Sequence, residues 1–539
     1  MPRVYVADKL EAEGLDLLRE AGLDVDARAG LAGDELKKAI EGADGVIVRS
    51  GTRITATLLQ QSEKLRAIVR AGVGVDNIDI PAATRRGIIV MNTPGGNTLS
   101  TAEQTLALLF ALVRHTPAAV NSLRSGQWER GKFTGTQLAG KTLGVIGLGR
   151  IGREVAKRAL ALEMHVVGYD PMLPAERIST LGMEPASDVD TVAARCDVLT
   201  VHVPYSDQTR GLIGAKQLAR MKKGSRVLNC ARGGIIDEAA LADALKSGHL
   251  AGAGIDVFEN EPPPKDHPLL ALPNVICTPH LGASTSEAQR SVAIEAAQLM
   301  IDFLLKGQIQ AAVNMTPIDR AELVELRPDL DVAYRLGLLL SQLQEGALRR
   351  VTLSCIGELA DRNPKLLTSA FLIGLIAQRL DEPVNLVNAD LLARERGIEI
   401  EIRQSKTQGD FRSLLRAEVE TTSTTNQAAA TLFGKGYPRL VQIGPHPLES
   451  YLDGNLLIMT HQDKPGLIGH IGVIFGRHEV NIAQMVVGRQ APGGEAIAVL
   501  NLDSAPPLEA LAEVKRHPAI RSLQFVKLPA MGDLPAWLA

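Results

Sequence analysis

The run GLGRIG, from Gly147 to Gly152, follows the apolar segment 142–146 and precedes a helix-like pattern that begins near Arg153. A glycine-rich turn between a strand and a helix lets backbone N–H groups approach a pyrophosphate, whose charge the helix N-terminus also favours. Three glycines at this spacing occur in ordinary tight turns as well. The run by itself therefore leaves both a nucleotide site and a simple turn open.

An acidic residue stands where a dinucleotide-binding fold requires one. The β-rich segment 165–169 is followed by Asp170, 18 residues beyond Gly152. A carboxylate there binds the ribose hydroxyls and repels a 2′-phosphate, so it favours NAD over NADP. Strand, turn, helix and acid together predict an NAD site.

Strand candidates recur at regular spacing through the middle of the chain. Helical patterns separate them, which predicts an α/β fold with a Rossmann-type doubly wound parallel sheet. Residues 1–98 alternate in the same way and predict another α/β unit. The strand candidates of the middle part are 142–147, 165–169, 198–203, 226–230, 254–258 and 275–277.

Three chemically distinct side chains follow the later strand candidates. Arg232, Glu261 and His280 come after the fourth, fifth and sixth of them, and ligands of such sheets bind at the carboxyl ends of the strands. Each has an ordinary explanation alone: a helix-capping arginine, an exposed glutamate and a satisfied histidine. Together they suit alcohol oxidation, in which the histidine takes the hydroxyl proton, the glutamate holds its tautomer and the arginine binds a carboxylate.

Two arginines end strand candidates in the first 98 residues. Arg49 and Arg70 are each followed by small residues. They are either solvated strand caps or a pair that converges on one anion, because the guanidinium fork matches carboxylate and phosphate.

A helical pattern and an aromatic loop follow. Residues 100–124 read as one long helix with a capping-box start at Ser100. The loop 126–133 carries Trp128, one of only two tryptophans. This tryptophan is either a packing plug or an interface anchor, and we favour the interface.

The composition excludes several classes of protein. The 539 residues are 22% charged with a formal net charge of −3, which indicates neither nucleic acid nor a membrane surface as partner. No signal-peptide core and no window of about 20 apolar residues is found, so we predict a cytoplasmic protein. The cysteines lack zinc-ligand spacing and are expected to be reduced structural thiols, with no metal: Cys196, Cys230, Cys277 and Cys355.

Several stretches together resemble the D-isomer-specific 2-hydroxyacid dehydrogenase family, over essentially the whole chain. The resemblance implies that Arg232, Glu261 and His280 are catalytic. It also implies a flavodoxin-like N-terminal domain that binds the substrate. The stretches are VRAGVGVDNID (69–79), MNTPGGNTLSTAE (91–103), GLGRIG (147–152) with Asp170, LNCARGGIIDE (228–238), GIDVFENEPP (254–263) and TPHLGAST (278–285).

The same resemblance assigns residues to the cofactor and to the substrate. Its cofactor positions are Gly147, Gly149, Arg150, Ile151, Gly152, Asp170, Val203, Cys230, Ala231, Arg232, Asp256, His280 and Gly282. Its substrate contacts are Arg49, Ser50, Arg70, Gly72 and Asn97, with Arg130 or Lys132 reaching the phosphate in a neighbouring subunit. Val73 departs from relatives that carry a threonine, so a hydroxyl contact to the cofactor is absent there.

The last part of the chain follows a βαββαβ order from residue 455 to residue 528, which is ferredoxin-like. The loop 461–466 and the segment 480–482 resemble an ACT domain, a module that binds amino acids at a pair of domains. This resemblance implicates His461, Asp463 and Asn481 in binding serine. An ordinary loop and cap is the alternative interpretation.

The resemblance divides the chain into four domains. Residues 319–453 match an intervening regulatory domain by position and length, and there Lys435 and Arg439 form either an anion site or a solvated surface. The predicted domains are a substrate domain at 1–98 completed by 287–317, an NAD domain at 99–286, the intervening α/β domain at 319–453 and the ACT domain at 454–529.

The resemblance is closest to members that oxidise 3-phospho-D-glycerate to 3-phosphohydroxypyruvate with NAD, the first step of L-serine biosynthesis. It implies serine feedback inhibition through the ACT domain and a homo-oligomer, with a tetramer favoured. The alternatives are a glyoxylate or hydroxypyruvate reductase, another D-2-hydroxyacid dehydrogenase, and, more distantly, an NAD-sensing corepressor-like protein. Arg49, Arg70 and the C-terminal regulatory half favour the first interpretation.

Overall fold

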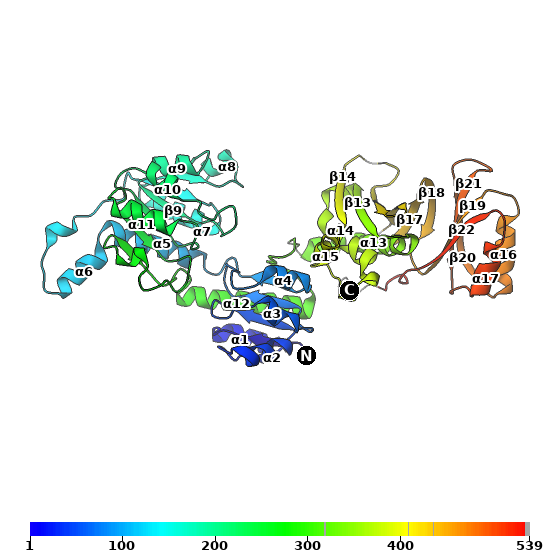
Figure 1. Cartoon of the computed structure of the whole chain (residues 1–539), viewed down its shortest axis with the longest axis horizontal. Helices are drawn as coiled ribbons and strands as arrows, with labels where there is room; N and C mark the ends of the chain where they lie inside the picture. The colour runs from blue at the N-terminus through cyan, green and yellow to red at the C-terminus, as the bar shows by residue number, and fades with distance from the viewer. Residues whose placement is uncertain (317, 319, 408, 435, 534–539) are drawn as a thin grey trace.

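The computed structural model describes residues 1–316, 318, 320–407, 409–434 and 436–533. Four sheets organise this part of the chain, and we call the parts built on them the N-terminal, Rossmann, intervening and C-terminal units. Figure 1 shows the Rossmann and C-terminal units at opposite ends, with the N-terminal and intervening units between them. Residues 317 and 319, at the predicted boundary between the substrate and intervening domains, and the candidate Lys435 lie outside the described ranges.

The N-terminal unit is a parallel sheet in the order β2-β1-β3-β4-β5. This is the flavodoxin-like order that the resemblance implied. Helices α1 and α12 pack together on one face, so the chain returns to this unit after the Rossmann unit. The elements are β1 (Arg3–Val6), α1 (Ala12–Glu20), β2 (Asp24–Asp26), α2 (Gly33–Glu41), β3 (Gly45–Val48), α3 (Ala56–Gln60), β4 (Ala67–Arg70), α4 (Ile80–Arg85), β5 (Ile89–Asn92) and α12 (Ser286–Lys306).

The Rossmann unit confirms the predicted doubly wound parallel sheet, with the order β12-β11-β10-β9-β6-β7-β8. Strands β9 and β11 are buried along their whole length, as expected for a parallel sheet covered on both faces. The strand order reverses between β6 and β9, which puts the ligand crevice at their carboxyl ends. The strands are β6 (Thr142–Ile146), β7 (His165–Tyr169), β8 (Glu184–Pro185), β9 (Val198–Val201), β10 (Arg226–Asn229), β11 (Gly252–Ile255) and β12 (Val275–Cys277).

The helices of the Rossmann unit connect these strands and cover both faces of the sheet. They are α7 (Arg150–Ala161), α8 (Ala175–Ser179), α9 (Val189–Arg195), α10 (Ala215–Arg220), α11 (Glu238–Lys246) and the short η2 (Pro268–Ala271). Among the described residues, no single helix is long and apolar enough to cross a membrane; only a bent pair, α5 (Thr98–Val113) with α6 (Thr116–Arg124), satisfies length and composition together.

The prediction of one helix over 100–124 is wrong. Helices α5 and α6 are bent by 59° at a break next to His115, which has a left-handed φ of 53°. Pro117 has no N–H to donate to the carbonyl four residues earlier, so one continuous helix cannot form there. The capping-box start is also wrong, because α5 begins at Thr98 and the Ser100 hydroxyl donates instead to the Gly282 carbonyl at 2.7 Å.

The intervening unit is a mixed sheet in the order β14-β13-β15-β16-β17-β18. Helices α13 and α14 pack against its inner face. The elements are α13 (Arg320–Leu343), β13 (Leu348–Gly357), η3 (Glu358–Asp361), α14 (Pro364–Ile376), η4 (Ala377–Arg379), α15 (Ala389–Glu395), β14 (Glu399–Ser405), β15 (Ser413–Thr421), β16 (Thr425–Phe433), β17 (Tyr437–Ile443) and β18 (His446–Tyr451).

The C-terminal unit has the predicted βαββαβ order, with an antiparallel sheet arranged β20-β21-β19-β22. This is the ferredoxin-like arrangement. Helices α16 and α17 cover one face, while apolar residues of the other face join the core of the intervening unit. The elements are β19 (Asn455–Gln462), α16 (Leu467–Arg477), β20 (Ile482–Arg489), β21 (Glu495–Leu502), α17 (Leu508–Lys515) and β22 (Ile520–Lys527).

A fully buried arginine ties the last two units together. Arg335 on α13 makes two 2.8 Å hydrogen bonds to Asp331, which balances its charge. Its remaining N–H groups donate to the carbonyls of Leu452, Pro529 and Ala530. These carbonyls flank the C-terminal unit on both sides, at the segment that enters it and the segment that leaves it. Because the two units also share a core, we treat them as one body.

Candidate active site

The three glycines of the 147–152 turn each meet a different steric requirement. Gly147 has a φ of 90°, and a Cβ there would collide with the carbonyl of His202. A Cβ at Gly152 would overlap the Gly147 carbonyl, so this glycine allows α7 to pack closely on the turn. At Gly149, the residue that precedes α7, a Cβ would meet no atom within 4 Å. Its backbone is therefore open to a pyrophosphate, and the turn fits a dinucleotide.

Asp170 follows β7 and lies beside this turn. Its carboxylate accepts hydrogen bonds from the backbone N–H of Leu148 at 2.8 Å and of Met172 at 2.9 Å. Each oxygen retains capacity to accept another hydrogen bond. The acid therefore holds the glycine turn to the end of the neighbouring strand and can still receive ribose hydroxyls.

Arg49 and Arg70 lie at neighbouring strand ends of the N-terminal unit. Val48 and Arg70 are directly paired across β3 and β4, so Arg49 continues beside Arg70. Within the described part of the chain, the Nε atoms of both arginines are buried without a hydrogen-bond partner. Burial, followed by the charge of Arg232, lowers the pKa of Arg70 to about 10. The arrangement carries more positive charge than its own acids balance, and an anion would stabilise it.

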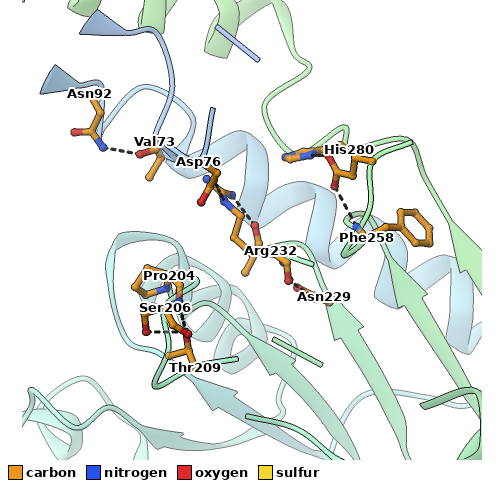
Figure 2. A network of polar contacts seen from close by, with 12 residues as sticks. Val73, Asp76, Asn92, Pro204, Ser206, Thr209, Asn229, Arg232, Phe258 and His280 are labelled. Atoms are coloured by element: carbon orange, nitrogen blue, oxygen red, sulfur yellow. Dashed lines mark hydrogen bonds and ion pairs between the residues drawn. The ribbon is translucent and has the colours of Figure 1, made fainter. Parts of the chain in front are cut away.

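Arg232 extends from the Rossmann unit toward Arg70 and Arg49 of the N-terminal unit. Its Nε donates to Asp76 Oδ2 at 2.9 Å across the space between the two units, and Figure 2 shows these side chains meeting there. Side chains at positions 72 and 74 would overlap the guanidinium groups of Arg70 and Arg232, respectively. Gly72 and Gly74 therefore leave the room that the two arginines occupy.

His280 and Glu261 meet at the same edge of the Rossmann sheet. The His280 Nδ1 lies 2.7 Å from Glu261 Oε2, and Glu261 Oε1 accepts from the Phe258 backbone N–H at 3.1 Å. Burial raises the pKa of Glu261, but the hydrogen bond and charge of His280, the Phe258 N–H and the charge of Arg232 together lower it by more, so the net pKa is lowered. The carboxylate therefore stays ionised and directs the other ring nitrogen of His280, Nε2, away from itself. Figure 2 shows His280 opposite Arg232.

At two of the predicted cofactor positions, Asp256 and Cys230, the side chain is buried inside the protein. The buried Asp256 carboxylate accepts from the Thr278 hydroxyl at 2.6 Å and from the N–H groups of Leu281 and Gly282 at 2.8 Å. It shapes the loop that carries His280. The Cys230 thiol is also buried, which raises its pKa to about 12, so only the backbone there remains to face a cofactor.

The other predicted positions lie along the same crevice. Ser50 is exposed in the loop after β3, and the Asn97 Oδ1, at the start of α5, is buried without a partner among the described residues. The Val203 side chain approaches Gly147. Arg150, the first residue of α7, lies beside Gly95 of the other unit. Ile151 and Ala231 are half-buried.

Three domain models match the chain in sequence order. Residues 106–282 match the D-isomer specific 2-hydroxyacid dehydrogenase NAD binding domain, residues 325–444 the D-3-phosphoglycerate dehydrogenase intervening domain and residues 455–519 the ACT domain. The D-3-phosphoglycerate dehydrogenase of Archaeoglobus fulgidus is 44% identical over 98% of this chain and 100% of its own length. The chain belongs to the D-3-phosphoglycerate dehydrogenase family. The Bacillus subtilis member is 40% identical over 98% of this chain and 100% of its own length.

Solved structures of other proteins match 58% of this family member. The Thermus thermophilus TT0316 protein is 39% identical and superposes with a TM-score of 0.53, covering 58% of this chain and 99% of its own. A glyoxylate reductase from Paecilomyes thermophila is 30% identical with the same TM-score, over 58% of this chain and 98% of its own. The chain is therefore an NAD-dependent oxidoreductase of the D-2-hydroxyacid type.

The structure does not bring all predicted site residues of this family member together. Within the described residues, no hydrogen bond or ion pair joins Arg130 or Lys132 to Arg49 or Arg70. Both lie in the short helix η1 (Arg130–Phe133), which follows α6. Lys132 is paired with Glu129 at 3.0 Å, and Figure 1 shows α6 projecting away from the rest of its unit.

The predicted serine residues are also separated within one chain. Strands β19 and β20 run in the same direction, because each pairs antiparallel with β21. Asp463 follows the end of β19 and accepts from Arg489 at 2.7 Å, which lowers the pKa of its carboxyl. Asn481 precedes the start of β20, so the two lie roughly 25 Å apart at opposite ends of the sheet. The His461 side chain is buried beside Gln462.

Sequence reasoning missed the acidic and amide residues that hold the arginines. Asp76 pairs with Arg232, and the Asn77 Nδ2 donates to the carbonyls of Arg49 and Thr52 at 2.6 Å each. Both residues lie inside the family-like stretch 69–79, and this was the only feature of the sequence that could have pointed to them. Their partners are distant in sequence, so only the fold reveals what they do.

Proposed function

We propose that this protein oxidises the C2 hydroxyl of 3-phospho-D-glycerate to the ketone of 3-phosphohydroxypyruvate with NAD, at the start of L-serine synthesis. The observation that carries this proposal is the group Arg49, Arg70 and Arg232, which faces the cofactor edge with unbalanced positive charge. A phosphorylated hydroxy acid has two anionic groups, so it needs more cationic contacts than glyoxylate or hydroxypyruvate does. The curated relatives that match over 98% of this chain carry the corresponding name.

In this mechanism Arg232 binds the substrate carboxylate and Arg49 and Arg70 bind the phosphate. The Arg232 guanidinium donates to Asp76 and to the Ala231 carbonyl and has further N–H groups, so it can also donate to a substrate carboxylate. The turn 147–152 and Asp170 would hold NAD, and bound NAD supplies the hydride acceptor. The His280 Nε2 takes the hydroxyl proton, while Glu261 keeps the ring oriented and stabilises its charged form.

We further propose that the protein is a homo-oligomer in which α6 and the following loop contact a second copy. No residue of α6 is buried in the described chain, although it carries the apolar residues Val120 and Leu123. Trp128 in the next loop is 77% exposed. Large exposed apolar side chains of this kind are typical of subunit interfaces. Such an interface would also carry Arg130 toward a neighbouring active site, and a tetramer is the favoured assembly.

Serine is the proposed effector of the ACT domain, and its site would form between two copies. Asp463 and Asn481 lie at opposite ends of one sheet, so they can meet at one ligand only if they come from different chains. A carboxylate and an amide are suited to the amino group and carboxylate of an amino acid. The site would thus depend on the oligomer.

The test of the proposed activity is an NADH-forming assay with several substrates. We expect kcat/KM for 3-phosphoglycerate to exceed that for glycerate and lactate by at least about 10²-fold, because those compounds lack the phosphate. The assay is run at neutral pH, with and without L-serine. Equal values for the three substrates would favour the general D-2-hydroxyacid dehydrogenase alternative.

Serine inhibition should depend on Asn481. Changing Asn481→Ala removes an amide that now donates to Asp503 at 2.7 Å, and we expect the serine concentration for half inhibition to rise by about tenfold or more. Asn426→Ala, the same change in the intervening unit, is the matched control. If Asn481→Ala keeps the parent response, the effector site lies elsewhere or serine is not the effector.

A further inference from the structure

Helix α4 begins at the substrate arginines. Asp79 caps its N-terminus by accepting from the Ala82 N–H at 3.0 Å. The residues just before it are Asp76, which pairs with Arg232, and Asn77, which holds the carbonyl of Arg49. A displacement of this helix would therefore move the groups that position two of the three arginines.

The other end of α4 contacts the intervening unit, about 9 Å further along the helix axis. The Asn385 Nδ2 donates to the Gly87 carbonyl at 2.9 Å, and the Asn388 Nδ2 donates to the Arg85 carbonyl at 3.2 Å. Carbonyl groups at a helix C-terminus have no partner within their own helix, so these amides satisfy them. Gly87 has a φ of 69°, and a side chain there would collide with Asn385.

An ion pair and a cavity also lie at this joint between the two halves of the chain. An ion pair joins Arg85 to Glu395 at the end of α15. Beside it lies a cavity of about 360 Å³, lined by Thr84 of α4, by Asn314 and by Lys365 and Ser369 of α14. Because an open cavity lies between the halves, a small shift of the intervening unit can rearrange the joint at low cost.

A shared core and several hydrogen bonds join the intervening unit to the ACT domain. Arg335 binds the chain on both sides of that domain, and the two units share a core. Gln342 of α13 also exchanges two 3.0 Å hydrogen bonds with the backbone of Lys527 on β22. A change in the ACT domain would therefore reach Asn385 and Asn388 as a movement of one body.

We propose that Asn385 and Asn388 are positioning residues for the active site, and that the regulatory half acts on the substrate arginines through α4. With both amides in place, α4 is held at its C-terminal end and the loop 76–79 keeps Arg49 and Arg232 in a binding arrangement. When the joint is released, this loop samples more conformations and the substrate loses prearranged contacts. The choice of 3-phosphoglycerate as substrate rests on the proposed function, whereas the contacts between α4 and the intervening unit do not depend on it.

The variant Asn385→Asp tests this coupling without removing the local turn. The Asn385 Oδ1 accepts from the Val387 and Asn388 N–H groups, and an aspartate retains that role. It loses the donor to Gly87 and places a negative charge against that carbonyl. We expect KM for 3-phosphoglycerate to rise roughly two- to tenfold, with kcat and NADH affinity within about 1.5-fold of the parent. We also expect faster amide hydrogen exchange at residues 76–87.

The matched control is Asn363→Asp, which makes the same change at the N-cap of α14. There Asn363 accepts from the Leu366 N–H, a role that aspartate fills equally well, so KM and exchange should stay at the parent values. A KM of Asn385→Asp within about 1.5-fold of the parent, or an equal shift in the control, overturns the proposal. If the parent protein does not oxidise 3-phosphoglycerate, the proposed function fails. Amide hydrogen exchange tests the coupling independently of the substrate: unchanged exchange at residues 76–79 in Asn385→Asp overturns the proposed coupling through α4.

Discussion

Replacing His280 by asparagine should lower kcat by about 10²- to 10⁴-fold and leave NADH affinity within about twofold. The His280 Nδ1 lies 2.7 Å from Glu261 Oε2, which keeps a proton on Nδ1 and leaves Nε2 free to accept the substrate proton. Asparagine can replace the Nδ1 contact but has no group that takes a proton at neutral pH. Steady-state NADH formation measures kcat, and fluorescence titration measures NADH affinity.

Two further variants separate this role from a general effect on folding. His249→Asn makes the same change at a histidine that contacts the Leu218 carbonyl, and it should leave kcat nearly unchanged. Glu261→Gln should lower kcat strongly, because Glu261 accepts from both His280 and the Phe258 N–H while glutamine has only one acceptor oxygen. A kcat of His280→Asn close to that of the parent would contradict the acid–base assignment.

Replacing Arg70 by alanine should raise KM for 3-phosphoglycerate by roughly 10- to 100-fold, the effect of losing hydrogen bonds to a charged group. KM for unphosphorylated glycerate should change much less. The buried guanidinium of Arg70 lies near Arg232, and its Nε has no partner among the described residues. Kinetics with both substrates, together with a thermal unfolding curve, distinguish lost phosphate binding from lost stability.

The matched control for Arg70→Ala is Arg66→Ala. Arg66 precedes the same strand and lies over the Phe303 ring at 5.3 Å, at the opposite end from the active site. Its removal should affect stability without changing the preference for phosphorylated substrate. Equal increases of KM for both substrates in Arg70→Ala would exclude Arg70 from the phosphate site.

Much of the fold could be predicted because its signals are local. Strand β6, the glycine turn, strand β7 and the acid at Asp170 follow one another within about 30 residues, and the structure confirms the sheet to which they belong. The helix over 100–124 was predicted wrongly because apolar periodicity continues through a break caused by Pro117 and a left-handed His115. The periodicity of apolar residues indicates which face of a helix is apolar, but it carries no information about the backbone N–H that Pro117 lacks.

The candidate site could be predicted only in part. Arg232, Glu261 and His280 follow successive strands, so their meeting at one sheet edge follows from the topology. Asp76 was missed because its partner Arg232 is 156 residues away and belongs to another unit. Asp463 and Asn481 lie at opposite ends of one sheet because β19 and β20 run in the same direction, whereas the sequence predicted a serine site at a pair of domains without indicating which residue each domain supplies.

The amino-acid sequence alone determined the chemical types at the site and the NAD preference, because they follow from the residues that end each strand and from the glycine turn. It also determined the order of the units, because each unit is built mainly from one segment of the chain. The tertiary structure was needed for the excess charge around Arg70, the pairing of Asp76 with Arg232 and the joint between α4 and Asn385. These are contacts between distant segments, and their geometry depends on how whole units pack. Burial and charge at such contacts are properties of the folded chain, since in the unfolded chain the same groups are solvated and far apart.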